Sequence, residues 1–474
     1  MGKVEKLTTY INTVFFSYDD SRKILLNNSK FKSKLDNESK GKELNDVCKK
    51  ISNSNINVVY LKNMDKNIHI AFSDYSEFRR HEQDDSLIYK VDNFNGNYSI
   101  STGIYCGIIN LGDVFPKLEI KIGYSDMFLK RMLNYCCGIY VDNNVSGESE
   151  NNESIYSLLI QYLFLISLRK VAVNDIPKRY VYLKERGYNI QGNIDIESYI
   201  NQDLFSIDKK ITYQYPSHLE IQNIVDVLYT ALKACNINRN NKFMPDLSRF
   251  ERHLGELYSG RRPTKRIINN TLKDKCLYNS LYSCYKKPLE YAKILLDNND
   301  LNFGNSNKIQ GISGFLVDAS FLWEMYLYNL LKFYLTDWQI ESQCEISFYD
   351  DAFFAKKNYP DFILTNKNTG KIFVLDAKFK MMNFENGDVD NDDIRQLHSY
   401  SYYFSLKEKN FFGGAALIYP TKAEPKDNNI DNMFGIKDIN YKFGIFSIKD
   451  PSDSKKIVNN ERCFIDKLKE FIES

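Results

Sequence analysis

The spacing of hydrophobic positions in the last third of the chain predicts alternating helices and strands. Shortly after Gly311, the segment GFLVDASFLWEMYLYNLLKFYL places apolar residues three and four apart, which is typical of a helix with a buried face. A second helix is predicted from about Asp392 to Lys407. The segments of strand character are QIESQCEISF, DFILTN and KIFVLDAKF between the two helices, and GGAALIYP as the last strand. This order predicts a compact α/β domain with a central mixed sheet over residues 306–474.

Three further regions precede this domain. Residues 1–57 are rich in Lys, Asn and Ser, which predicts a solvated helix or loop. The sequence indicates no role for this polar N-terminal segment. Residues 58–150 carry short β-type runs separated by polar turns, and they predict a β-rich N-terminal domain. Residues 151–305 are predicted to be mainly helical, with one strand-like interruption, YVYLKERGYNIQGNIDI. The chain is therefore expected to be an α+β multidomain protein.

The longest apolar run favours a buried helix over a membrane span. It extends from Leu158 to Leu168, contains Gln161 and is too short to cross a bilayer. The N-terminal residues MGKVEK lack the apolar core of a signal peptide. We therefore expect a cytoplasmic protein without a membrane partner.

The composition argues against a uniformly basic surface, disulfide bonds and a zinc site, but it does not indicate a function. Lys and Arg total 63 against 61 Asp and Glu, so a surface that binds nucleic acid has to come from a local patch. The 9 cysteines are scattered without a C-x-x-C pair, which indicates a reducing compartment. The 5 histidines show no zinc-site spacing.

Charged residues stand at the ends of two neighbouring strands of the predicted α/β domain. Pro360 cannot donate to a sheet ladder, so it marks the start of a strand and places Asp361 at its mouth. The segment TNKNTG has turn chemistry and should close a hairpin. On the next strand Asp376 and Lys378 are two residues apart, so they project from the same face. The hairpin is expected to bring Asp361 beside Asp376.

This arrangement predicts hydrolysis of a phosphodiester bond. Two converging carboxylates repel each other, and a hard divalent cation with oxygen ligands relieves that repulsion. Mg²⁺ at this point can hold a scissile phosphate and lower the pKa of a bound water. Lys378 adds a positive charge that orients the water or stabilises the transition state.

Three more residues are candidates for the same site, each with a simpler alternative. Glu324 lies in an otherwise apolar helical run, where a carboxylate is either a third acidic group at the metal or a partly exposed, salt-bridged residue. Gln396 and Tyr400 are four apart on the second helix and share a face. They could hold the water, Lys378 or a DNA phosphate, or they could belong to an ordinary solvated or packing face.

A basic stretch precedes the α/β domain and is a candidate surface for the DNA backbone. Its residues are Arg249, Arg252, His253, Arg261, Arg262, Lys265 and Arg266. Such a cluster could follow phosphates, although a solvated helix face with a turn at Pro263 fits equally well.

The ordered combination of these residues resembles a known nuclease superfamily. A Glu on a helix, Pro-Asp on one strand, Asp-Ala-Lys on its partner and Gln-x-x-x-Tyr on a helix resemble the PD-(D/E)xK nucleases, and the last motif looks like their RecB-type branch. Upstream, CGIINLGDVFPKLEIKIGYSDMFLKRMLNYCCGIYV and KRYVYLKERGYNIQGNIDI resemble segments of McrC-like restriction subunits. The resemblance covers about residues 100–420. It departs at Ile120, where the family often has Pro, and at Asn193, where a basic residue is common.

The resemblance implies a nuclease with a separate motor. It implies Mg²⁺, for which Mn²⁺ can substitute, held by Asp361, Asp376 and the backbone carbonyl of Ala377, with Glu324 as a further ligand. It also implies DNA as substrate and an AAA+ GTPase (McrB-like) as partner, engaged by the N-terminal domain. The chain carries no G-x-x-x-x-G-K-[ST] phosphate loop, so no nucleotide is expected to bind through one.

Two other functions compete with an Mg²⁺-dependent endodeoxyribonuclease subunit of an antiviral restriction system. One is a regulatory module of nuclease-like fold that docks on the motor and stimulates it. The other is a stand-alone RecB-type repair nuclease, which the upstream McrC-like segments count against. Retention of Asp361, Asp376 and Lys378 together favours catalysis. Self-association stays open.

Overall fold

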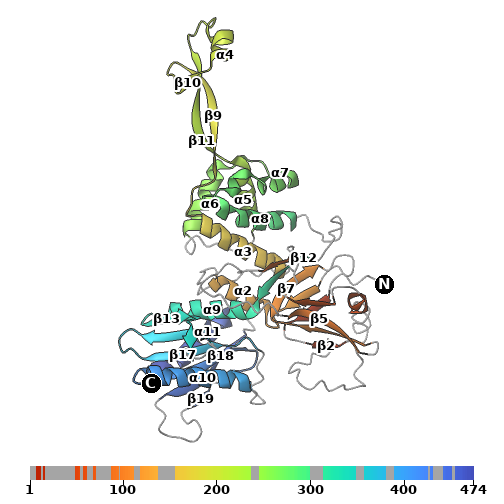
Figure 1. The fold of residues 1–474 in the computed structure, drawn as a ribbon, viewed down its shortest axis with the longest axis vertical. Helices are drawn as coiled ribbons and strands as arrows, with labels where there is room; N and C mark the ends of the chain where they lie inside the picture. The colour runs from red at the N-terminus through yellow and green to blue at the C-terminus, as the bar shows by residue number, and fades with distance from the viewer. Residues whose placement is uncertain are drawn as a thin grey trace. The chain divides into compact units, whose positions relative to one another are not determined.

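The computed structural model divides the chain into two compact units. The first comprises Met1–Tyr156 with Ser306–Ser474, and the second comprises Ser157–Asn305. The residues that the structure describes are 7–11, 14–16, 48–53, 57–60, 68–70, 87–94, 97–110, 118–136, 155–235, 245–298, 313–348, 357–380, 389–424, 428–430, 441–450 and 454–473. The architecture is mixed α+β (Figure 1).

A six-stranded mixed sheet forms the C-terminal part of the first unit. Its strands in spatial order are β13 (Trp338–Ser342), β16 (Phe362–Asn366), β17 (Ile372–Ala377), β18 (Phe412–Thr421), β20 (Lys442–Lys449) and β19 (Asn428–Ile430). The first three pair antiparallel, whereas β17, β18 and β20 run parallel. The hairpin predicted between β16 and β17 is present. Its turn ends at Gly370, whose φ of 72° is unfavourable for residues with a side chain.

Helices cover this sheet on both faces because side chains alternate along each strand. The helices are α9 (Ala319–Tyr334), α10 (Asn391–Lys407) and α11 (Ser454–Glu473). On β17, Val374 packs in one cluster with Tyr400 of α10. The neighbouring Phe373 meets Phe471 of α11 instead, with ring centroids 5.6 Å apart. The face of β17 that carries Val374 also carries Asp376, so α10 lies over the charged residues.

The predicted order of elements in this part needs two corrections. The first helix does not begin near Gly311, because Ser313–Asp318 forms strand β12 and α9 begins at Ala319. Asp318 fixes this boundary, since its carboxylate accepts the backbone N–H groups of Ser320 and Phe321. GGAALIYP is also not the last strand, because β20 and α11 follow it and pack on each other.

Two more sheets form the N-terminal part of the first unit. One has the order β1 (Leu7–Tyr10), β8 (Leu118–Lys121), β7 (Tyr105–Asn110), β12, β4 (Ile68–Ile70), and the other has the order β2 (Val14–Phe16), β6 (Asn97–Thr102), β5 (Leu87–Phe94), β3 (Val58–Tyr60). The helix α2 (Asp126–Cys136) follows β8. The expectation of only a solvated helix or loop for residues 1–57 is wrong at 7–10 and 14–16, which pair with β8 and β6. The polar stretch 17–47 lies outside the described residues.

The second unit combines helices with a long hairpin. Its helices include α3 (Ile155–Val171), α5 (Gln222–Ala234), α6 (Pro245–Leu257), α7 (Lys265–Thr271) and α8 (Lys286–Asn298). The hairpin consists of β9 (Lys178–Gly187) and β11 (Ile211–Glu220), with β10 (Asn193–Ile194) beside β11. The region 151–305 is thus less helical than predicted, because the strand β11 was not predicted from the sequence. Its sequence ITYQYPSHLE contains an interior proline, which argues against a strand.

The apolar run at Leu158–Leu168 lies in α3, where Phe164, Leu165 and Leu168 are fully buried. The prediction of a buried helix is confirmed. Within the described ranges, no helix has both the length and the apolar character needed to cross a membrane.

A buried ion pair joins α2 to the C-terminal sheet domain. Arg131 on α2 donates to Glu461 on α11 through Nε (2.8 Å) and Nη2 (2.6 Å). The hydroxyl of Tyr326 on α9 donates to the same carboxylate at 2.8 Å. Three helices therefore depend on one charged group whose side chain is fully buried.

Arg131→Met is expected to lower the free energy of unfolding by about 3–5 kcal/mol, because it leaves a buried carboxylate without its counter-charge. Chemical denaturation of this variant and the wild-type protein measures the difference. The double variant Arg131→Met/Glu461→Met removes both charges and should recover most of the loss. A double variant as unstable as the single one would contradict this account.

Candidate functional site

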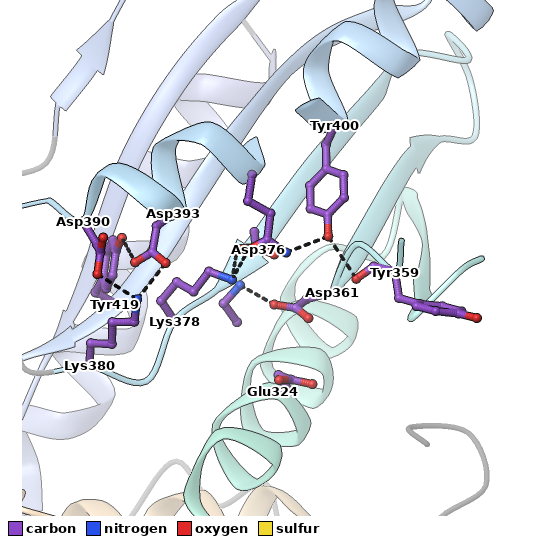
Figure 2. A network of polar contacts seen from close by, with 12 residues as sticks. Glu324, Tyr359, Asp361, Asp376, Lys378, Lys380, Asp390, Asp393, Tyr400 and Tyr419 are labelled. Carbon is purple, nitrogen blue, oxygen red and sulfur yellow. Dashed lines mark hydrogen bonds and ion pairs between the residues drawn. The ribbon is translucent and has the colours of Figure 1, made fainter. Parts of the chain in front are cut away.

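The hairpin of β16 and β17 brings Asp361 and Asp376 together. Phe362 pairs with Leu375 in an antiparallel ladder, so the next pair along it, Asp361 and Asp376, face each other. The backbone N–H of Ala377 donates to Asp361 Oδ2 at 2.7 Å, which fixes that carboxylate against the end of β17. Figure 2 shows both carboxylates beside Lys378, with Glu324 below them on α9.

Asp376 is a strongly perturbed carboxyl group of this site. Its side chain is 1% exposed, and its Oδ2 lies 2.6 Å from Lys378 Nζ. That oxygen nevertheless accepts no well-oriented hydrogen bond from any described residue. Burial, and then the charge of Asp361, raise the pKa of Asp376 to about 7, and the ion pair with Lys378 offsets only part of this. A further positive charge at this carboxylate would therefore be strongly favoured.

Lys378 is held by a chain of hydrogen bonds from α10. Its Nζ donates to Gln396 Oε1 at 2.8 Å, and Gln396 Nε2 donates to the Tyr400 hydroxyl at 2.8 Å. Tyr400 in turn donates to the backbone carbonyl of Tyr359 at 3.4 Å. Burial lowers the pKa of Lys378, but the charges of Asp376 and Asp361 outweigh burial and raise it. The amine thus stays protonated, and the Gln-x-x-x-Tyr pair serves to orient it.

Glu324 reaches the two strands through a residue that the sequence did not single out. Glu324 is 1% exposed, so a partly exposed position is excluded. Gln343 Nε2 donates both to Glu324 Oε2 (3.0 Å) and to Asp361 Oδ1 (2.9 Å). Gln343 follows β13 with a φ of 53°, a strained conformation for a residue with a side chain. Only its place at a strand end in QIESQCEISF hinted at such a role.

Gln343→Leu is expected to weaken divalent-cation binding about tenfold, because two acidic groups lose the donor that holds them in place. Calorimetric titration with Mg²⁺ measures the change. Gln339→Leu is the matched control, since Gln339 is exposed on β13 and its side chain bonds only to Glu341 among the described residues. Equal affinities for the Gln343 variant and the wild-type protein would show that the amide does not organise the site.

The donor set fits a hard divalent cation with few protein ligands. The described residues contain no group of three or more His, Cys, Asp and Glu side chains arranged to hold a metal. Asp361 and Asp376 instead supply two carboxylates, and Asp376 Oδ2, which accepts no well-oriented hydrogen bond from a described residue, has lone-pair capacity left for a cation beside Lys378. Mg²⁺ commonly binds through one or two carboxylates and keeps several waters. Glu324 is linked to Asp361 by Gln343 and is better placed to support that carboxylate than to ligate directly.

The basic stretch lies in the second unit, whereas the residues described above lie in the first. Arg249 and Arg252 are on α6, and Lys265 and Arg266 begin α7. Arg261 and Arg262 occupy the turn between these helices, and all six side chains are exposed.

Comparisons with known proteins identify the type of system in which this site occurs. A family model described as McrBC 5-methylcytosine restriction system component matches residues 100–420. No curated protein matches the chain. Among solved structures, a refined half-complex from the tetradecameric assembly of Thermococcus gammatolerans McrB AAA+ hexamers with bound McrC is similar, with 14% identity, a TM-score of 0.45 and coverage of 98% of this chain and 100% of that chain. A cryo-EM structure of the Thermococcus gammatolerans McrBC complex has 16% identity, a TM-score of 0.28 and coverage of 70% and 88%.

Proposed function

Because this chain belongs to the McrBC family of restriction system components, we propose that it is the McrC-like subunit that cuts DNA. The proposed reaction is hydrolysis of a phosphodiester bond by a PD-(D/E)xK site that uses Mg²⁺. The observation that carries the proposal is the meeting of Asp361, Asp376 and Lys378 at one end of a hairpin. An AAA+ GTPase is the proposed partner, as expected for this kind of restriction system.

Each side chain has a distinct part in the proposed mechanism. Mg²⁺, when bound, polarises the phosphate and makes its bound water more acidic. Asp361 and Asp376 would hold the cation, together with the carbonyl of Ala377. Lys378 directs its Nζ toward the scissile phosphate, where its charge stabilises the additional negative charge of the transition state. Gln396 keeps that amine in place through its 2.8 Å hydrogen bond.

A feature of the second unit also supports binding to a protein partner. The part of that unit beyond the paired strands of the hairpin exposes several large apolar side chains. They are Tyr188, Ile196, Ile200, Leu204, Phe205 and Ile207. Apolar side chains gathered on one surface element are typical of a site that another protein covers.

Plasmid cleavage with Mg²⁺ tests the proposal. The chain is assayed alone and with its AAA+ partner and GTP, on methylated and unmethylated DNA. Cleavage only with partner and nucleotide is the expected result, and the methylation contrast defines the target. Cleavage by the isolated chain would support a stand-alone nuclease instead. Stimulation of the partner's GTPase without any cleavage would replace the proposal by the regulatory module.

A further inference from the structure

Two chain connections lead from the N-terminal five-stranded sheet directly to the candidate site. The strand β12 of that sheet runs straight into α9, which carries Glu324. The strand β8 ends at Lys121, and the segment after it carries Tyr124 and Ser125. Both routes lie within the first unit. The second route reaches Phe379 and Lys380, the two residues that follow Lys378.

Tyr124 holds two backbone segments of the C-terminal sheet domain. Its hydroxyl donates to the carbonyl of Pro420 at 3.1 Å and lies 3.4 Å from the carbonyl of Lys380. The ring of Tyr124 packs on Phe379, with centroids 5.5 Å apart. Tyr124 is 8% exposed and Phe379 is 4% exposed, so this contact is closed to water.

Phe379 lies between the two lysines of the site in sequence. Its ring also meets Trp323 of α9, with centroids 6.0 Å apart. With Phe379 anchored in this aromatic group, Lys378 points to Asp376, and Lys380 donates to Asp393 on α10 at 2.8 Å (Figure 2). A shift of Phe379 would therefore move Lys378 along with it.

The second segment that Tyr124 holds leads to the same helix. Pro420 follows Tyr419, whose hydroxyl donates to Asp393 Oδ2 at 3.0 Å. Ser125 anchors the tyrosine itself, because its backbone N–H and its hydroxyl both donate to Asp450, at 2.8 Å and 2.5 Å. The contacts of Tyr124 thus reach both the segment after β17, which carries Lys378, and the strand β18, whose Tyr419 contacts α10.

We infer that Tyr124 is a positioning residue for Lys378, through which the N-terminal sheet sets the geometry of the nuclease site. The inference rests on the proposed function for its effect on cleavage, but the placement of Lys378 can be measured without cleavage. Removing only the hydroxyl releases the Lys380 and Pro420 carbonyls and leaves the ring on Phe379.

Tyr124→Phe is the test, with Tyr285→Phe as matched control. Tyr285 is also buried, and its hydroxyl donates to backbone carbonyls, the nearest being Asp175 at 3.2 Å, but it lies in the second unit. In the full complex, Tyr124→Phe is expected to lower kcat for DNA cleavage about tenfold with KM unchanged, because a small misplacement of a catalytic group is costly. Acylation of Lys378, followed by mass spectrometry, should be several-fold faster in this variant. Tyr285→Phe should change neither quantity.

The outcomes separate the two proposals. If Tyr124→Phe cleaves DNA and is acylated at Lys378 like the wild-type protein, the positioning role is overturned and the nuclease proposal stands. If the wild-type complex does not cleave, the nuclease proposal fails, and the acylation of Lys378 still decides the positioning role. Equal acceleration at the exposed Lys371 would indicate general loosening and would also overturn it.

Discussion

Asp376→Asn and Lys378→Ala are each expected to lower the rate of DNA cleavage by about 10²–10³-fold. In the proposed mechanism, Asp376→Asn removes the buried charge that would hold the cation, and Lys378→Ala removes the charge that would face the phosphate. Loss of one such preorganised group from a site closed to water commonly costs about 10²–10³ in rate. Asp376 is 1% exposed and the Lys378 side chain is 16% exposed, so water can replace neither group well.

Plasmid cleavage by the complete complex measures these losses, and GTPase stimulation of the partner shows that each variant still folds and docks. The matched controls are Asp392→Asn and Lys371→Ala. Asp392 is exposed on α10 and pairs only with the exposed Arg395 among the described residues. Lys371 is exposed just before β17. Cleavage by both site variants at the rate of these controls would refute the assignment of Asp376 and Lys378.

The parts of the site that follow from local geometry could be predicted from the sequence. A short hairpin places Asp361 beside Asp376 wherever the sheet lies in the molecule. Helical spacing likewise puts Gln396 and Tyr400 on one face, and the structure adds that this face meets Lys378. Such relations depend on residues near one another in sequence, and one chain is enough to show them.

The residues that escaped prediction act across long sequence separations. Tyr124 contacts the carbonyl of Pro420, and Arg131 meets Glu461, although neither pair shares a motif. Gln343 gains its role only because α9, β13 and β16 meet at its side chain. Long-range contacts also explain why the start of α9 was predicted too early. The segment SGFLVD suits a helix or a strand, and pairing with β7, roughly two hundred residues earlier in the chain, decides between them.

Affinity for Mg²⁺ is expected to fall about fiftyfold from pH 7 to pH 5, approaching about tenfold per pH unit at the lower end. The reason is the pKa of Asp376, which burial and the charge of Asp361 raise from 3.8 to about 7. Below that pH the carboxyl holds a proton, which the cation has to displace. Above it the carboxylate is already ionised, so affinity should level off. An ordinary aspartate would give no change over this range.

Calorimetric titration of the protein with Mg²⁺ in the absence of DNA measures this dependence without any need for cleavage. Repeating it in buffers of different ionisation enthalpy counts the protons, and about one should be released per cation at pH 6 and almost none at pH 8. Asp376→Asn should bind more weakly and lose this dependence. Asp392→Asn should retain it, because that carboxylate is exposed and pairs with Arg395 instead of contributing to the site. An affinity that stays constant between pH 5 and pH 8 would mean that Asp376 is ionised throughout. Lys378 would then neutralise it fully, and the attraction between this site and a divalent cation would have to come from Asp361.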